Sequence, residues 1–150
     1  MKTQFLKSDD NNAIQTAAEI LQNGGLVAIP TETVYGLAAN ALDSEAVRKI
    51  FVAKGRPQDN PLIVHVSSVE EIEPLVEEID PRAYALAEKY WPGPLTVIMK
   101  KSPLIPDEVS AGLDTVAVRM PSNLVARELI KVSGLPLAAP SANLSGSPSP

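Results

Sequence analysis

Two cations one residue apart, Lys54 and Arg56, are the first residues of this 150-residue chain whose types and spacing suggest chemistry. In an extended segment side chains alternate, so both would point the same way, with their Cα atoms about 6–7 Å apart. An ammonium and a guanidinium so placed would bind neighbouring phosphates, and Gly55 between them would let a ligand approach the backbone. The alternative is a solvated pair in a loop, which is the better interpretation of an isolated Lys-x-Arg.

A row of hydroxyls follows the apolar run at residues 26–29. Thr31, Thr33 and Tyr35 alternate, so in an extended segment they would line one face. Open α/β sheets bind ligands just past the C-terminal ends of their strands. A threonine-rich edge strand accounts for the same residues equally well, because Thr and Tyr favour strands.

Other polar side chains lie in or just after apolar runs. Ser141 and Asn143 repeat the spacing of the two cations with neutral hydrogen-bonding groups. Arg119 lies within an apolar run, where a charge must reach solvent or find an anionic partner. His65 is the only histidine in the chain. A lone histidine near a strand end is more often a hydrogen-bonded structural residue than a catalyst.

Alternating helices and strands are needed to position these residues. Four segments carry apolar residues at helical spacing after a residue that can cap a helix: Asp10 or Asn11, Asp43 or Ser44, Asp80 and Ser122. The segments expected to be strands are residues 4–6, 26–29, 62–66, 95–99, 115–120 and 137–139. Residues 68–71 have the form of a capping box, although Pro74 should shorten the helix that follows. The alternation predicts a three-layer α/β domain around a twisted, partly parallel sheet flanked by helices.

The composition is that of a globular domain, with 45% hydrophobic and 21% charged residues. Because cysteine is absent and histidine occurs once, we expect no disulfide and no Cys/His metal site. No apolar run reaches the length of a signal peptide core or the ~20 residues of a membrane span. We therefore expect a single cytoplasmic domain over residues 1–150 that does not associate with membranes.

The net charge of −5 and the 4% aromatic content argue against a broad nucleic-acid-binding surface. Any bound anion must therefore be held by a local cluster of cations. Neither a P-loop nor a G-x-G-x-x-G motif is present, and no serine lies in G-x-S-x-G.

The chain resembles the YrdC-type threonylcarbamoyl-adenylate synthases. The resemblance lies in Lys54-x-Arg56 and Ser141-x-Asn143, and it extends through PTETVYGL (30–37), NPLIVH (60–65), WPGPLT (91–96) and GLDTVAVR (112–119). It covers nearly the whole chain in order. Members of that family continue well past the Ser-Pro-Ser-Pro stretch at residues 147–150. Residues 1–150 are therefore expected to form a YrdC-like catalytic domain whose C-terminal part is missing.

The resemblance implies a nucleotidyltransferase that forms L-threonylcarbamoyl-AMP from L-threonine, bicarbonate and ATP and releases pyrophosphate. The product is the precursor of the threonylcarbamoyl group on adenosine 37 of certain tRNAs. Downstream tRNA threonylcarbamoyl-transfer proteins would then be partners, and contact with tRNA itself would be weak or indirect. Mg²⁺ is expected on the ATP phosphates, with no metal site made by the protein.

The resemblance also implies which residues bind each substrate. The residues expected at ATP are Lys54, Arg56, Thr115, Ser141, Asn143 and Ser149, of which Lys54, Arg56, Ser141 and Asn143 are the expected catalytic residues. The residues expected at L-threonine are Thr31, Asn60, His65 and Arg119. Such chemistry needs no activated Ser or Cys, because the substrates supply the nucleophile and the protein positions them and neutralises phosphate charge.

Three alternatives remain open from the sequence. An RNA-binding module could use a basic concave surface, although the acidic charge and scarce aromatics count against it. A carbamoyl-adenylate-handling domain of a hydrogenase maturation protein would keep the chemistry and change the acceptor, but the zinc-finger and acylphosphatase parts of such proteins have no counterpart here. The third alternative is a segment that folds without turnover.

Overall fold

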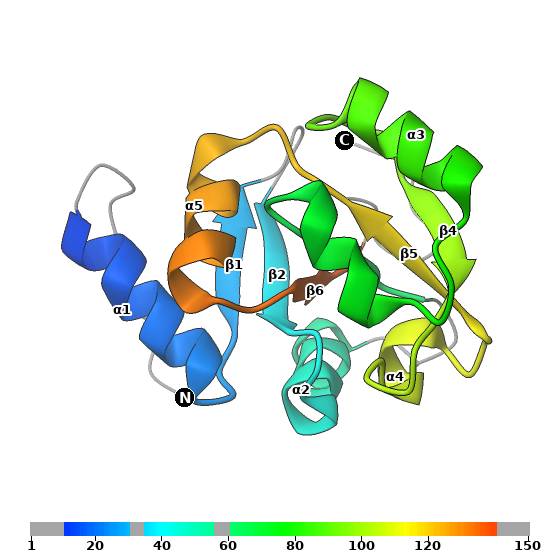
Figure 1. Cartoon of the computed structure of the whole chain (residues 1–150). Helices are drawn as coiled ribbons and strands as arrows, with labels where there is room; N and C mark the ends of the chain where they lie inside the picture. The colour runs from blue at the N-terminus through cyan, green and yellow to red at the C-terminus, as the bar shows by residue number, and fades with distance from the viewer. Residues whose placement is uncertain (1–10, 31–34, 56–60, 141–150) are drawn as a thin grey trace.

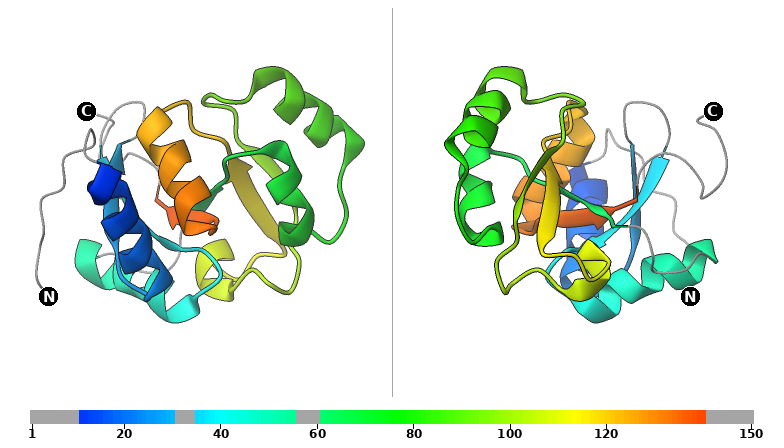
Figure 2. Two further views of the ribbon diagram at one scale, coloured as in Figure 1. Left: turned by 60° about the vertical axis from the view of Figure 1, so that its left-hand side comes forward. Right: turned by 90° about the vertical axis from the view of Figure 1, so that its right-hand side faces the viewer.

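A six-stranded sheet in the order β1-β2-β6-β3-β5-β4 forms the centre of the molecule, as the computed structural model shows for residues 11–30, 35–55 and 61–140 (Figures 1 and 2). The strands are β1 (Val27–Pro30), β2 (Tyr35–Asn40), β3 (Ile63–His65), β4 (Val97–Lys100), β5 (Thr115–Arg119) and β6 (Leu137–Ala139). Of the strand pairs described, β3 with β5 is parallel and the others are antiparallel. The predicted mixed sheet flanked by helices is confirmed.

The helices are α1 (Asn11–Gln22), α2 (Ser44–Lys54), the 3-10 helix η1 (Val69–Leu75), α3 (Pro81–Tyr90), α4 (Asp107–Ser110) and α5 (Leu124–Ser133). Helices α1 and α5 lie side by side against β1 and β2, and α3 lies near β4 at the opposite edge of the sheet (Figure 1). None of the helices described is both long and apolar enough to cross a lipid bilayer.

The sheet has a hydrophobic core on each face. Successive residues of β6 show this directly, since Leu137 and Ala139 pack with α1 and α5. Ala138 between them packs into the second core, with residues from α2, η1 and α3. Because side chains alternate along a strand, neighbouring residues of β6 must face opposite sides. Helices therefore cover both faces at this strand, which confirms the predicted three layers.

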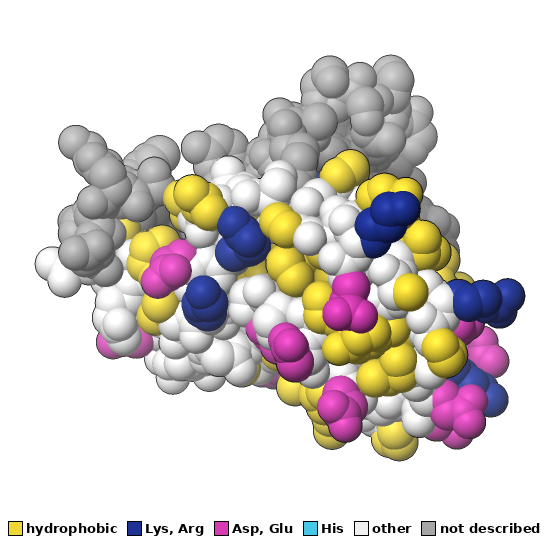
Figure 3. All heavy atoms as spheres, turned by 45° about the horizontal axis from the view of Figure 1, so that its top comes forward, with side chains coloured by type: hydrophobic (Ala, Val, Ile, Leu, Met, Phe, Trp, Pro, Cys, Tyr) yellow, Lys and Arg dark blue, Asp and Glu magenta, His cyan; other side chains and the backbone are white. Residues whose placement is uncertain are grey.

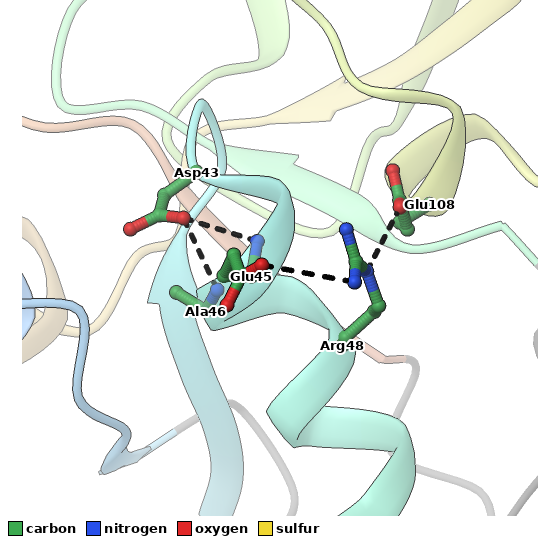
Figure 4. A network of polar contacts seen from close by, with 5 residues as sticks. All are labelled: Asp43, Glu45, Ala46, Arg48 and Glu108. Atoms are coloured by element: carbon green, nitrogen blue, oxygen red, sulfur yellow. Dashed lines mark hydrogen bonds and ion pairs between the residues drawn. The ribbon is translucent and has the colours of Figure 1, made fainter.

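Helix α2 begins where the sequence predicts. The Asp43 Oδ1 atom accepts hydrogen bonds from the backbone N–H groups of Glu45 and Ala46, at 3.0 and 3.2 Å (Figure 4). The Arg48 side chain then ties α2 to α4, because its Nε–H donates to Glu108 Oε2 at 3.1 Å (Figure 4). The first half of α2 is thus fixed by its cap and by the neighbouring helix.

The extended geometry considered for Lys54 to Arg56 does not hold at its first two residues. Lys54 is the last residue of α2, and Gly55 ends the helix in the left-handed region with φ of 63°. The Gly55 N–H donates to the Val52 carbonyl at 3.2 Å, as is common where glycine terminates a helix. Strand alternation cannot apply across such a turn. Arg56 lies outside the described residues.

Capping side chains close in the sequence determine where α3 and α5 begin. The Asp80 Oδ1 atom accepts from the Arg82 N–H at 2.9 Å, and this backbone hydrogen bond holds the pKa of the Asp80 carboxyl below its ordinary value. The predicted cap of α5 at Ser122 is wrong by one residue. Asn123 Oδ1 accepts from the N–H groups of Val125 and Ala126 at 2.9 and 3.1 Å. Only a side chain at position 123 can reach these two donors, which belong to the second and third helical residues.

The segment before η1 departs from a capping box. Ser68 precedes the helix but makes no side-chain cap bond. The Glu71 carboxylate accepts instead from the backbone N–H of Ser67, at 3.2 Å, and from the hydroxyls of Ser67 and Ser68. Pro74 lies inside η1, which is a 3-10 helix as expected for a segment that proline shortens.

Two described elements escaped the sequence-based prediction. Strand β2 pairs with both β1 and β6, although its sequence YGLAAN is poor in strand-forming residues. The short helix α4 lies between two of the expected strands, in a stretch for which we predicted no helix or strand. The predicted strand at residues 4–6 lies outside the described part of the chain.

Replacing Asp43 by alanine should lower the free energy of unfolding by about 0.5–2 kcal/mol, because two N–H groups at the start of α2 lose their acceptor. Denaturant unfolding followed by circular dichroism measures the change. Asp43→Asn is the matched control, since asparagine keeps the accepting oxygen and should retain most of the stability. An equal loss in both variants would show that the negative charge, and not the acceptor, is what stabilises the helix end.

Candidate functional site

One face of β5 is buried and the other is half-exposed. Val116 and Val118 are buried in the core, with exposed fractions of 2% and 0%. Thr115, Ala117 and Arg119 alternate with them and are partly exposed. Two of the predicted site residues, Thr115 and Arg119, therefore share a face of one strand, with the small side chain of Ala117 between them.

The flanking strands extend this face. On β4, Ile98 lies opposite Ala117 and Lys100 lies opposite Thr115, and both β4 side chains are exposed. On β3, Ile63 lies opposite Ala117. Apolar side chains therefore form the middle of the half-exposed face, and polar or charged side chains lie at its ends. We call this set (Ile63, His65, Ile98, Lys100, Thr115, Ala117, Arg119) the open sheet face.

His65 and Arg119 are neighbours across the parallel pair β3–β5. Adjacent strands are about 4.8 Å apart, so an imidazole and a guanidinium lie next to one another at one end of the open sheet face. The His65 Nδ1 atom is 3.1 Å from the Ile63 carbonyl oxygen, and the His65 side chain is buried. A carbonyl can only accept, so Nδ1 carries a proton, and Nε2 is the unprotonated nitrogen of the neutral ring.

The guanidinium of Arg119 is held by a backbone carbonyl. Its Nε–H donates to the Gly93 oxygen at 3.1 Å, and the Gly93 N–H donates in turn to the Met120 oxygen at 2.9 Å. The sequence offered no side-chain signal for this contact, because the acceptor belongs to the backbone. A guanidinium presents five N–H donors in a plane, and this bond uses one of them. Arg119 is therefore oriented by the backbone where the strand ends.

Thr115 lies at the other end of the open sheet face. It is four positions from Arg119 in β5, which places the two Cα atoms about 13 Å apart along the strand. Lys100 lies opposite Thr115. Sequence reasoning missed Lys100 as a candidate anion-binding residue. The alternation of the sequence VIMK in β4, with buried Val97 and Met99, is the signal that could have found it.

The structure describes four of the predicted site residues. It brings His65 and Arg119 together, puts Thr115 on the same face, and places Lys54 at the C-terminal end of α2. The other six lie outside the described residues, and their predicted roles stay predictions: Thr31, Arg56, Asn60, Ser141, Asn143 and Ser149.

Two hollows of about 400 Å³ each lie away from the open sheet face. One lies between η1 and α3, where Glu70, Glu73 and Glu88 are among the lining residues. The other is lined mainly by apolar side chains, with Glu71 and Lys131 among them. Figure 3 shows one face of the molecule, with hydrophobic side chains bordered by acidic ones. Carboxylates repel phosphates and carboxylate ligands, so the open sheet face is the better candidate for binding an anion.

Comparison with known proteins places most of the chain in one family. The Sua5/YciO/YrdC family model, described as telomere recombination, matches residues 19–150. The threonylcarbamoyl-AMP synthase of Pyrococcus abyssi is 58% identical over 137 residues, which cover 91% of this chain and 40% of the relative. That of Bacillus subtilis is 51% identical over 149 residues, which cover 99% of this chain and 43% of the relative.

Two solved structures relate the fold to ligands. The P. abyssi Sua5 structure, in complex with L-threonine, superposes with a TM-score of 0.87 at 54% identity and covers 98% of this chain and 42% of that one. Full-length HypF in its phosphate- and nucleotide-bound form superposes with a TM-score of 0.75 at 28% identity and covers 91% and 21%. The chain thus spans about two fifths of the length of the P. abyssi and B. subtilis relatives.

The buried hydrogen bond of His65 predicts its tautomer. At a pH where the ring is neutral, we expect the proton on Nδ1, because only that tautomer can donate to the Ile63 carbonyl. A ¹⁵N-detected correlation spectrum of the imidazole distinguishes the two nitrogens, and the single histidine removes any ambiguity of assignment. A neutral ring protonated on Nε2 would contradict the described geometry.

Proposed function

The chain belongs to the Sua5/YciO/YrdC family, and from this membership we propose that it forms L-threonylcarbamoyl-AMP from L-threonine, bicarbonate and ATP, releasing pyrophosphate. The observation that carries the proposal is the 58% identity to a threonylcarbamoyl-AMP synthase over 91% of the chain. The likeness to HypF, at 28% identity, is weaker and makes carbamoyl transfer to another acceptor the second candidate.

The open sheet face suits an amino acid and a nucleotide bound side by side. Arg119 is a planar cation matched to a carboxylate, and we assign it to the carboxylate of threonine. Thr115 and Lys100 lie about 13 Å further along the face, on the nucleotide side. The apolar residues between these ends, Ile63 and Ile98, exclude water from part of the surface and so strengthen the ionic contacts beside them.

The proposed reaction has two steps. The threonine amine attacks the carbon of bicarbonate, and loss of water gives a carbamate. A carbamate oxygen then attacks the α-phosphorus of ATP in line, and the bond from that phosphorus to the bridging oxygen breaks with release of pyrophosphate. The substrates thus supply both nucleophile and leaving group. The protein contributes position and charge neutralisation, which are the main sources of catalysis in such transfers.

The remaining roles follow the family motif. We assign Lys54, Arg56, Ser141, Asn143 and Ser149 to ATP, and Thr31 and Asn60, with His65, to threonine. Within the described part of the chain, no group of three Asp, Glu or His side chains could hold a metal ion. The proposal therefore gives Mg²⁺ no protein ligand there, and the ion that accompanies ATP would be held by phosphate oxygens. The product would pass to proteins that transfer threonylcarbamoyl to tRNA.

Pyrophosphate release should require ATP, bicarbonate and L-threonine together. The measurement is a coupled pyrophosphate assay in which each substrate is left out in turn, with the adenylate product identified by mass spectrometry. Release that continues without threonine would contradict the proposal. Carbamoyl-AMP formed from carbamoyl phosphate in place of threonine and bicarbonate would favour the second candidate.

Lys54→Ala and Arg56→Ala should each reduce kcat/KM for ATP by about tenfold or more, because each removes a charge-assisted hydrogen bond worth roughly 1.5–3 kcal/mol. Steady-state kinetics at saturating threonine measures the effect. Lys89→Ala is the control, since Lys89 is an exposed cation at the end of α3 that lies over the Tyr90 ring. Full activity in either site variant, or an equal loss in the control, would refute the assignment.

A further inference from the structure

We propose that Trp91 is a positioning residue that acts through the Gly93 carbonyl to orient the Arg119 guanidinium for the carboxylate of the amino-acid substrate. The inference rests on the proposed function for the identity of that substrate. The role of the segment from Trp91 to Leu95 is not explained by the reaction itself, since none of its side chains has been assigned to a substrate.

A hydrogen bond from the Trp91 side chain joins the two ends of the segment from Trp91 to Leu95. Trp91 follows the last residue of α3, and its indole Nε1–H donates to the Leu95 carbonyl at 2.8 Å. The indole itself is buried, with an exposed fraction of 8%. Trp91 therefore anchors the segment in the core and at the same time fixes the distance between its two ends.

The closed segment is then attached to the end of β5 by two further bonds. The Gly93 N–H donates to the Met120 carbonyl at 2.9 Å, and the Gly93 carbonyl accepts from Arg119 Nε at 3.1 Å. Gly93 is buried with φ of 156°, and a Cβ there would lie 3.1 Å from the Tyr90 carbonyl oxygen. The backbone thus passes where a side chain would not fit, and its carbonyl points at the arginine.

The orientation of Arg119 matters because a carboxylate is bound bidentately by two N–H groups in the plane of the guanidinium. A bond to Nε fixes that plane, since Nε is the atom through which the group is attached. If the acceptor moves, the guanidinium keeps its charge but loses the hydrogen bond that orients it at Nε. Affinity for the carboxylate should then fall, while phosphate contacts elsewhere stay unchanged.

Trp91→Phe tests the chain of contacts, because phenylalanine keeps an aromatic ring in the core and removes the indole donor together with two ring carbons. We expect the Kd for L-threonine to rise roughly two- to tenfold, as for loss of one neutral hydrogen bond. The Kd for ATP should not change. Isothermal titration with each ligand gives both values, and the hydrogen-exchange rate of the Arg119 Nε–H, read by NMR, should rise in the same variant.

Ser102→Ala is the matched control. Ser102 has the same exposed fraction of 8%, and its hydroxyl also donates to a backbone carbonyl, that of Pro74, at 2.8 Å. Ser102 follows β4, whereas the Trp91 segment precedes that strand. The Ser102 hydroxyl also accepts a hydrogen bond from the Leu104 N–H. The control removes a hydroxyl that makes two hydrogen bonds, so an effect that comes only from lost hydrogen bonding in the core would appear in it as well. Its Kd for threonine and its Arg119 exchange rate should match those of the unaltered chain.

A double-mutant cycle separates positioning from direct effects. In an Arg119→Ala background, Trp91→Phe should have no further effect on the Kd for threonine, because the residue through which it acts is gone. Additive losses would overturn the inference.

The exchange rate of the Arg119 Nε–H separates a failure of this inference from a failure of the proposed function, because it needs no ligand. An unchanged rate in Trp91→Phe would overturn the inference whatever the substrate is. If the unaltered chain binds no threonine while the exchange rate responds as expected, the proposed function fails and the substrate assignment of Arg119 falls with it.

Discussion

The parallel pairing of β3 with β5 is the contact on which the rest of the structure depends. It fixes His65 beside Arg119, and the Val66 N–H extends it by donating to the Arg119 carbonyl at 3.0 Å. Parallel neighbours cannot be joined by a tight turn, so the chain must leave the sheet and return. Here the chain passes through η1 and α3 to β4 at the edge of the sheet, and then through α4 to β5. The segment that holds Gly93 against Arg119 is part of that return path.

Helices do not cover the two faces of the sheet equally. The candidate site lies on the part of the sheet that has one exposed face. Helices pack on both faces at β6, whereas β4 and β5 have one buried and one exposed face. Ile98 is 66% exposed, which forgoes stabilisation of about 25 cal/mol for each Å² of apolar surface left in water. An apolar side chain between cationic ends is useful to a ligand with a charged group at each end, so the loss of stability is consistent with binding.

Local chemistry accounts for what could be predicted. Asp43 and Asp80 mark helix starts because their side chains bond the first N–H groups, which requires no tertiary contact. Alternation along β5 likewise separates Thr115 and Arg119 from the core. Prediction failed where an element depends on strands distant in the sequence, or where the hydrogen-bond acceptor is a backbone group. Strand β2 exists through pairing with β1 and β6, and the acceptor of Arg119 is a backbone carbonyl.

The position of β6 has a consequence for how the protein is made. It lies between β2 and β3, yet it follows every other described strand in the sequence. During synthesis, which proceeds from the N-terminus, β2 and β3 must therefore wait for their common neighbour until residues 137–139 have left the ribosome. Until then each presents an unpaired edge, the feature through which nascent chains associate with one another. The nascent polypeptide consequently exposes these two edges until β6 emerges and fills the gap between them.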